Sequence, residues 1–352
     1  MSKPIQHIAV IRLSAMGDVA MTVPVIRALV DQYPHLQITV VSRPFFKPFF
    51  EGIPNLHFFE VDLKHRHKGF KGLINLTHDL ISLGVDAIAD LHNVLRSKVV
   101  RTLFVLKGAK VAYTDKGRAD KKALTRAQNK VFKPLKTMFD RHVETFEKLG
   151  FPIDLYSESH ANLFPKKAVL TETILNISGD KGSHQWIGIA PFAQYEGKVY
   201  PNDLMQQVID VLAANANGTI FLFGGGTAEQ IRLDEMAAGK ANVVNLVGKL
   251  TFAEELHLIS NLDIMLSMDS GNAHIAAMLG VKVVTLWGAT HPYAGFAPFN
   301  QPLDYCLTAD RSLYPLLPTS VYGNKVVEGY QDAMRSISPD EITHKIQQLL
   351  YK

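Results

Sequence analysis

Residues 263–287 have the sequence DIMLSMDSGNAHIAAMLGVKVVTLW, and this stretch predicts a complete strand–helix–strand unit. The apolar runs at its two ends are typical of buried strands, and the segment Asn272–Leu279 between them is typical of a short helix. Asp269-Ser270-Gly271 joins the first strand to that helix. Ligands of open parallel sheets bind at such strand ends, and a helix that begins there directs unpaired backbone N–H groups at a phosphate. The alternative is an ordinary helix cap by Asp269 or Ser270.

The rest of the chain repeats this alternation of apolar strands and amphipathic helices. Strands are predicted at His7–Leu13, Leu36–Val41, Leu56–Val61, Val85–Leu91, Ala109–Tyr113, Trp186–Ala190, Thr219–Phe223, Val243–Leu246, Ile264–Ser267 and Val281–Leu286. A long helical region is expected from about Thr125 to Leu149, and a last helix at Pro339–Leu350. This alternation favours parallel sheets that are covered by helices on both faces.

Length and chain breaks divide the protein into two domains. A single core stops growing near about 250–300 residues, and this chain has 352. Gly150-Phe151-Pro152 ends the first run of elements and opens an irregular linker. We therefore expect an α/β protein with two doubly wound, Rossmann-like domains, at residues 1–165 and 166–335, that face a cleft. Residues 336–352 are expected to form a C-terminal helix that packs back toward the N-terminal domain.

Composition excludes several classes of protein. With 47% hydrophobic and 20% charged residues, the chain is typical of a globular protein. Its one cysteine, Cys306, excludes an internal disulfide and a cysteine-cluster metal site. No run of about 18 apolar residues is present, and the N-terminus lacks the pattern of a signal peptide, so we expect a cytoplasmic protein.

The glycine-rich turns match neither of the common nucleotide-binding fingerprints. Gly224-Gly225-Gly226 follows a strand, but Glu229 stands where the last glycine of GxGxxG belongs, and GxxxxGK[ST] does not occur. The turn can still bring backbone close to a ribose or a phosphate, and plain turn geometry is the alternative. Asp-x-Asp is also absent, so the sequence predicts no carboxylate pair that would bridge a metal ion to a diphosphate.

Positive charge is concentrated in the first half of the chain. The net charge is +4, but residues 1–150 hold 24 lysines and arginines against 13 acidic residues. Two clusters stand out, at Lys64–Lys71 and Lys116–Lys136. Such clusters attract phosphates, nucleic acid or anionic lipid, and the alternative for each is a solvated helix face.

Asp18 is a candidate catalytic base in the first half. It follows the first strand, opens a helix and stands beside Gly17, which lets a ligand approach. Helix capping is the alternative role for such a carboxylate. His92, at the end of another strand of the same half, would line the same wall, or it is merely structural.

Several stretches resemble the signature segments of one enzyme family. They are Ser14-Ala15-Met16-Gly17-Asp18, Asp90-Leu91-His92-Asn93 with Leu95-Arg96-Ser97, Lys198-Val199-Tyr200-Pro201, Asp269-Ser270-Gly271-Asn272-Ala273-His274, and Met334-Arg335-Ser336-Ile337-Ser338-Pro339. Together they resemble the ADP-heptose:lipopolysaccharide heptosyltransferase family, glycosyltransferase family 9, which has the GT-B fold. The resemblance spans nearly the full length, although Tyr200 replaces the family's tryptophan, and Ala15 and Ala273 replace frequent hydroxyl residues.

The resemblance implies an inverting glycosyltransferase that moves a sugar, expected to be heptose, from ADP-heptose to a lipopolysaccharide core acceptor. Asp18 matches the family's catalytic base. Donor and phosphate contacts are implied for Ser14, Lys198, Asp269, Ser270, Gly271 and His274. We also expect donor ribose or acceptor contacts at Gly225, Glu229, His92 and Arg96. Neither a cofactor, a metal nor nucleic acid is expected. The basic first half suits an anionic glycolipid acceptor and peripheral contact with the cytoplasmic face of an inner membrane.

Three alternatives remain open at the level of sequence. The same family includes enzymes that would use another sugar. A nucleotide-sugar epimerase of GT-B type shares the two-domain architecture and works without an acceptor. A catalytically silent binding protein is the third alternative, and the joint presence of Asp18, Lys198 and His274 argues against it.

Overall fold

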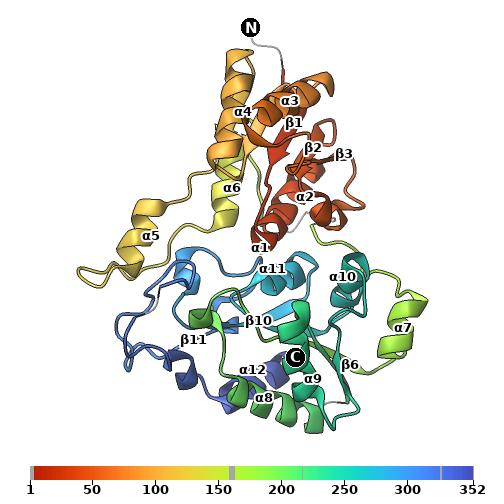
Figure 1. Cartoon of the computed structure of the whole chain (residues 1–352), viewed down its shortest axis with the longest axis vertical. Coiled ribbons are helices and arrows are strands. Elements are labelled where there is room, and N and C mark those ends of the chain that lie inside the picture. The colour runs from red at the N-terminus through yellow and green to blue at the C-terminus, as the bar shows by residue number, and fades with distance from the viewer. Residues whose placement is uncertain (1–3, 158–162, 216, 326, 352) are drawn as a thin grey trace. The chain divides into compact units, whose positions relative to one another are not determined.

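The computed structural model describes residues 4–157, 163–215, 217–325 and 327–351 (Figure 1). Its contacts divide the chain into two compact units. Unit 1 comprises residues 1–116 and 138–165, and unit 2 comprises residues 117–137 and 166–352. The expectation of two α/β domains is confirmed, but their composition along the chain differs from the prediction.

Unit 1 contains a five-stranded parallel sheet in the order β3-β2-β1-β4-β5. Its strands are β1 (His7–Ile11), β2 (Gln37–Ser42), β3 (Leu56–Glu60), β4 (Ala87–Asp90) and β5 (Lys110–Tyr113). Its helices are α1 (Met16–Ala20), α2 (Thr22–Gln32), the 3₁₀ helix η1 (Pro44–Phe50), α3 (Gly69–Ser82), α4 (Leu95–Leu106) and α6 (Met138–Glu147). Helix α2 packs on α6 and α3 packs on α4. The central strand β1 is buried on both faces, as its continuous apolar sequence predicts.

Unit 2 contains a six-stranded parallel sheet in the order β11-β10-β9-β6-β7-β8. Its strands are β6 (Gln185–Ala190), β7 (Gly218–Leu222), β8 (Val243–Asn245), β9 (Ile264–Met268), β10 (Lys282–Trp287) and β11 (Cys306–Thr308). The α-helices are α5 (Arg118–Thr125), α7 (Glu172–Ser178), α8 (Asn202–Asn215), α9 (Gly226–Ala237), α10 (Phe252–Ser260), α11 (Gly271–Met278) and α12 (Pro339–Leu350). Short 3₁₀ turns are η2 (Glu196–Lys198), η3 (Pro292–Ala294), η4 (Leu303–Tyr305) and η5 (Ala333–Ser336). The predicted strand–helix–strand unit is confirmed as β9-α11-β10, and the edge strand β11 was not predicted.

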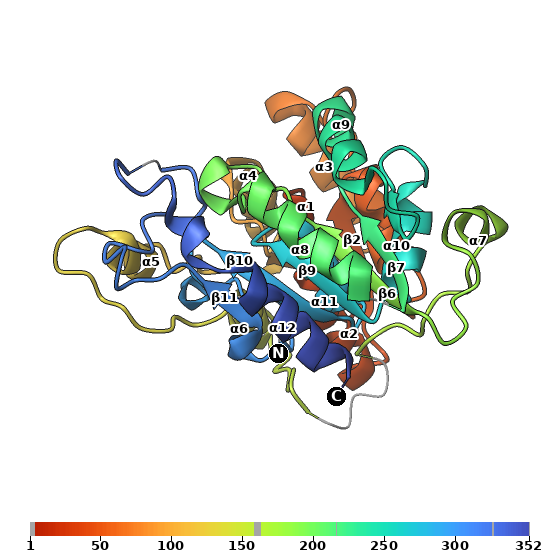
Figure 2. The ribbon, with the colours of Figure 1, turned by 90° about the horizontal axis from the view of Figure 1, so that it is seen from below.

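The C-terminal helix belongs to unit 2. Helix α12 lies against α8 and against strands β9 and β10, so it is part of unit 2 (Figure 2). Its apolar stripe of Ile342, Ile346 and Leu349 joins the core of that unit. Burial of this stripe therefore fixes the helix on the sheet of unit 2.

The prediction of one long helix between Thr125 and Leu149 is wrong. Helix α5 ends at Thr125, α6 begins at Met138, and the residues between them form neither helix nor strand. Pro134 cannot continue a helix, because it lacks the N–H donor. The segment 117–137, which we call the strap, packs with unit 2 although its neighbours in the sequence belong to unit 1.

Among the described residues, none of the helices combines the length and the apolar character needed to cross a bilayer.

Candidate active site

Asp18 lies in the first turn of α1, directly after strand β1. Its carboxylate forms an ion pair with Arg12 Nη2 at 2.7 Å and accepts a hydrogen bond from the Ala15 N–H at 3.2 Å. The second contact closes the first turn of the helix, so the capping role is real. The side chain remains 34% exposed, so the same carboxylate is accessible to a ligand.

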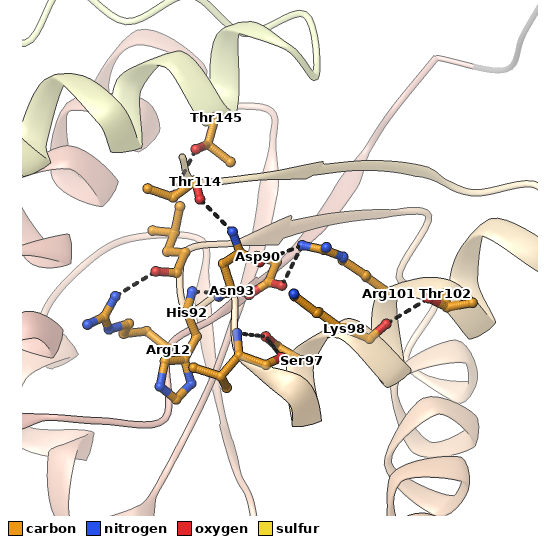
Figure 3. Close-up of polar contacts among 12 residues, drawn as sticks. Arg12, Asp90, His92, Asn93, Ser97, Lys98, Arg101, Thr102, Thr114 and Thr145 are labelled. Carbon is orange, nitrogen blue, oxygen red and sulfur yellow. Dashed lines mark hydrogen bonds and ion pairs between the residues drawn. The ribbon is translucent and has the colours of Figure 1, made fainter. Parts of the chain in front are cut away.

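Arg12 stabilises this turn through its contacts with Asp18 and Ser14. It was not among the predicted site residues. It is only 5% exposed. Besides Asp18 it donates to the carbonyl oxygen of Ser14 at 2.9 Å. It also donates to the carbonyl oxygen of Leu91, the residue before His92, at 2.6 Å (Figure 3). It therefore ties the end of β1 to the end of β4. The sequence signal for Arg12 was its place two residues before Ser14, directly ahead of the first family signature.

The structure brings His92 close to Ser14 at the strand ends of unit 1. The Leu13 N–H donates to His92 Nδ1 at 3.4 Å, which leaves Nε2 as the protonated nitrogen, 3.5 Å from the Ser14 hydroxyl. Burial, together with the positive charges of Arg12 and Lys116, lowers the pKa of His92 to about 4. The ring is therefore neutral at neutral pH and serves as a hydrogen-bonding group.

A fully buried carboxylate, Asp90, fixes the turn that carries His92. One of its oxygens accepts the backbone N–H groups of His92 and Asn93 at 3.1 and 2.7 Å, and the other pairs with Arg101 at 3.1 Å (Figure 3). Arg101 also lies over the ring of Tyr113, 4.0 Å from its centroid. Arg96, in the first turn of α4, is exposed.

Lys198 and Asp269 meet in unit 2. Their charged groups are 3.0 Å apart, with the lysine 15% and the aspartate 9% exposed. Lys198 ends the η2 turn after strand β6, and Asp269 follows strand β9, which is the neighbour of β6 in the sheet. Gly323 packs on the aliphatic stem of Lys198 so closely that any side chain there would clash, and its φ of +82° also requires glycine. The lysine is therefore held in place by its partner and by this glycine.

Ser270 does not cap helix α11 with its side chain. Its hydroxyl lies 3.1 Å from the Ser267 hydroxyl, and the structure shows no cap bond from it. The ordinary-cap alternative is thus wrong for Ser270. The N–H groups in the first turn of α11, which begins at Gly271, point out of the N-terminal end of the helix, and Asp269 lies two residues before that end. His274, four residues after Ser270 on the same helix, is 8% exposed.

Glu229 organises the turn after strand β7. Its carboxylate accepts the Gly225 N–H at 2.8 Å, which closes the glycine-rich turn on the first turn of α9. The space above Gly225 is open, since an added Cβ would meet no atom within 4 Å. A ligand can therefore approach the backbone here, and contact with a ribose or a phosphate stays a prediction.

The predicted residues thus form two groups, each at the carboxyl ends of the strands of one sheet. Ser14, Asp18 and His92 lie in unit 1, and Lys198, Asp269, Ser270 and Gly271 lie in unit 2. Within the described part of the chain, no three histidine, cysteine, aspartate or glutamate side chains are grouped so that they could hold a metal ion.

Comparison with known proteins identifies the family. The family model described as glycosyltransferase family 9 (heptosyltransferase) matches residues 73–315. The chain is 23% identical over 304 residues to the lipopolysaccharide core heptosyltransferase OpsX of Haemophilus influenzae, covering 84% of this chain and 82% of that protein. Among solved structures, the family 9 glycosyltransferase of Veillonella parvula superposes with a TM-score of 0.75 at 19% identity, covering 100% of this chain and 99% of the other. E. coli heptosyltransferase WaaC, solved with ADP, gives a TM-score of 0.68 at 18% identity, covering 98% and 100%.

These two structures share the fold of this chain, two parallel sheets with helices, which is the GT-B architecture. The family model covers more than half of the chain. The protein belongs to glycosyltransferase family 9, the heptosyltransferase family.

Proposed function

We propose that the protein transfers heptose from ADP-heptose to the sugar core of a lipopolysaccharide acceptor, with inversion at the anomeric carbon and without a metal ion. The observation that carries this proposal is the Lys198–Asp269 pair beside the first turn of α11. A cation and several backbone N–H groups that converge on one point are what a departing diphosphate requires. The relatives named as heptosyltransferases, and WaaC solved with ADP, support the identity of the sugar and of the nucleotide.

In the proposed reaction, the oxygen of the acceptor hydroxyl attacks the anomeric carbon of the donor, and Asp18 takes the proton of that hydroxyl. The new glycosidic C–O bond forms while the C–O bond to the diphosphate breaks, so one displacement inverts the centre. The diphosphate leaves with the negative charge, which Lys198 and the α11 N–H groups stabilise. Arg12 holds the Asp18 carboxylate at the strand end through an ion pair, with Nη2 2.7 Å from the carboxylate oxygen.

Roles follow for the remaining residues. Ser14, whose hydroxyl lies 3.5 Å from His92, is proposed to contact phosphate, and Ser270 and Gly271 to hold the diphosphate with His274 behind them. Asp269 keeps Lys198 in place and, with Gly225 and Glu229, is proposed to meet the ribose. Exposed Arg96 is available to an anionic acceptor. We also propose that the enzyme works at the cytoplasmic face of an inner membrane.

The test is release of ADP from ADP-heptose with and without a delipidated core acceptor. Transfer predicts that release depends on the acceptor and that a heptosylated product appears. Turnover of a nucleotide sugar with no acceptor present would instead support the epimerase. Thermal-shift screening with ADP, UDP, GDP and their sugars identifies the donor, because a tight ligand raises the melting temperature by mass action.

A further inference from the structure

The strap carries most of the second basic cluster that the sequence shows, and it brings this charge to unit 2. Residues 117–137 hold seven lysines and arginines and one acidic residue, Asp120. The remainder of unit 2, residues 166–352, holds thirteen basic and eighteen acidic residues. The basic strap thus packs on a unit that is otherwise acidic. The contacts that anchor the strap determine which of its side chains face outward.

Three inward side chains fasten the strap. The ring of Phe132 lies under the guanidinium of Arg311, 3.5 Å from the ring centroid, and contacts His291 and Tyr293 at 5.0 Å. Lys130 Nζ donates to the carbonyl oxygens of Pro318 and Leu124 at 2.7 and 2.9 Å. Lys121 is buried over the ring of Phe296, 4.0 Å from its centroid. Two of the basic side chains are therefore structural, and they anchor the segment.

The outward side chains of the strap include cations that are exposed and form no ion pair among the described residues. Arg118, Lys122 and Lys133 are exposed, and none of them forms an ion pair with another residue among those described. Arg118 and Lys122 share one face of α5, because they are four residues apart. Val131 and Lys133, the neighbours of the anchored Phe132 in the sequence, are both exposed, whereas Phe132 is partly buried.

Two apolar side chains are exposed in this region, one on the strap and one on the loop that packs against Phe132. The Val131 N–H bonds to the Ala123 carbonyl oxygen at 3.0 Å, which places exposed Val131 beside the Lys122 turn of α5. Leu313 is 67% exposed on the loop after β11. Arg311 holds this loop, since it donates to the Leu317 carbonyl oxygen at 2.9 Å and covers Phe132. Figures 1 and 2 show α5 beside the loops that follow β11.

We propose that Arg118, Lys122, Val131, Lys133 and Leu313 form a docking surface for an anionic lipid bilayer. Unpaired cations are attracted to acidic headgroups, and exposed aliphatic side chains among them gain by entering the headgroup boundary. A free anionic sugar would account for the cations but not for the exposed Val131 and Leu313. The proposal rests on the proposed function, which gives the enzyme an acceptor anchored in a membrane.

The test is co-sedimentation of the full-length protein with phosphatidylcholine vesicles that contain or lack phosphatidylglycerol. One variant combines Arg118→Gln, Lys122→Gln and Lys133→Gln, and a second combines Val131→Ser and Leu313→Ser. The matched control combines Lys64→Gln, Lys68→Gln and Lys71→Gln, three exposed lysines of unit 1. Circular dichroism checks that each variant is folded, and transfer to a delipidated acceptor is measured in parallel.

Each cation near an acidic membrane contributes about a five-fold increase in binding, so the strap triple variant should bind anionic vesicles about 10²-fold more weakly. The apolar double variant should lose the binding that persists at high salt. Both should retain transfer to the delipidated acceptor, and the lysine control should bind vesicles like the wild type.

Unchanged vesicle binding in the strap variant, or an equal loss in the lysine control, would overturn the proposal. A raised KM for the delipidated acceptor in the strap variant, with vesicle binding intact, would make this surface an acceptor subsite and overturn it as well. Vesicle binding by a wild-type protein that transfers no sugar would contradict the proposed function while leaving the docking surface in place.

Discussion

The turns after β1 and after β9 have the same architecture, but they expose groups of opposite charge. Each follows a central parallel strand, begins a helix and contains an aspartate paired with a cation. In the first turn the cation, Arg12, is buried and its partner Asp18 is 34% exposed. In the second turn Asp269 is 9% exposed, and Lys198 is the more exposed partner at 15%. One turn therefore offers a carboxylate that can take a proton, and the other offers a cation that can meet a phosphate.

This contrast predicts different kinetic defects for the two turns. Asp18→Asn should lower kcat by about 10²–10⁴, because the base is lost, while the donor affinity stays within about three-fold. The check is steady-state transfer to a delipidated acceptor together with calorimetric titration of ADP. Glu51→Gln, at an exposed acid of the same unit, is the control and should behave like the wild type. If Asp18→Asn kept full activity, Asp18 would not be the base.

Lys198→Ala should mainly weaken donor binding. One lost charge-assisted contact corresponds to about 1.5–3 kcal/mol, or about 10- to 150-fold in the donor dissociation constant. The measurement is titration of ADP and ADP-heptose, with Lys240→Ala as the control, because Lys240 pairs with Asp210 elsewhere in unit 2. A variant that lost acceptor affinity and retained donor affinity would reverse the two assignments.

The first basic cluster should act on the acceptor, with a smaller effect. Arg66 is not available there, because its guanidinium pairs with Asp79 at 2.5 Å. Neutralising Lys64, Lys68 and Lys71 should raise the acceptor KM about three- to ten-fold and flatten its salt dependence, because exposed charges act mainly by steering. Initial rates at several salt concentrations measure this. A change in donor KM alone would show that the cluster belongs to the donor side.

The smallest expected effect is that of chelation. With no Asp-x-Asp in the sequence and Lys198 in place for the diphosphate, EDTA should leave the rate unchanged. The experiment compares transfer before and after dialysis against EDTA. Activity that disappears and returns with Mg²⁺ or Mn²⁺ would show that the leaving group depends on a metal.

Much of the architecture follows from local patterns in the sequence. Apolar runs such as Ile8–Ile11 and Ile264–Met268 are buried on both faces, as parallel strands require, and polar turns follow them. Asp18 and the Asp269–Gly271 turn could be predicted for this reason, because a polar residue directly after such a strand has to lie at the carboxyl edge of the sheet. The family signatures added Lys198, which has no comparable local signal.

Partnerships between distant residues were decided only by the tertiary structure. Nothing in the sequence around Arg66 shows that Asp79 neutralises it, and nothing around Phe132 shows that Arg311 will cover its ring. The same holds for the strap and for α12, which joined unit 2 because their apolar and cationic side chains found partners there. Periodicity determines which face of an element is buried, whereas the choice of partner depends on the free energy of contacts between residues far apart in the chain.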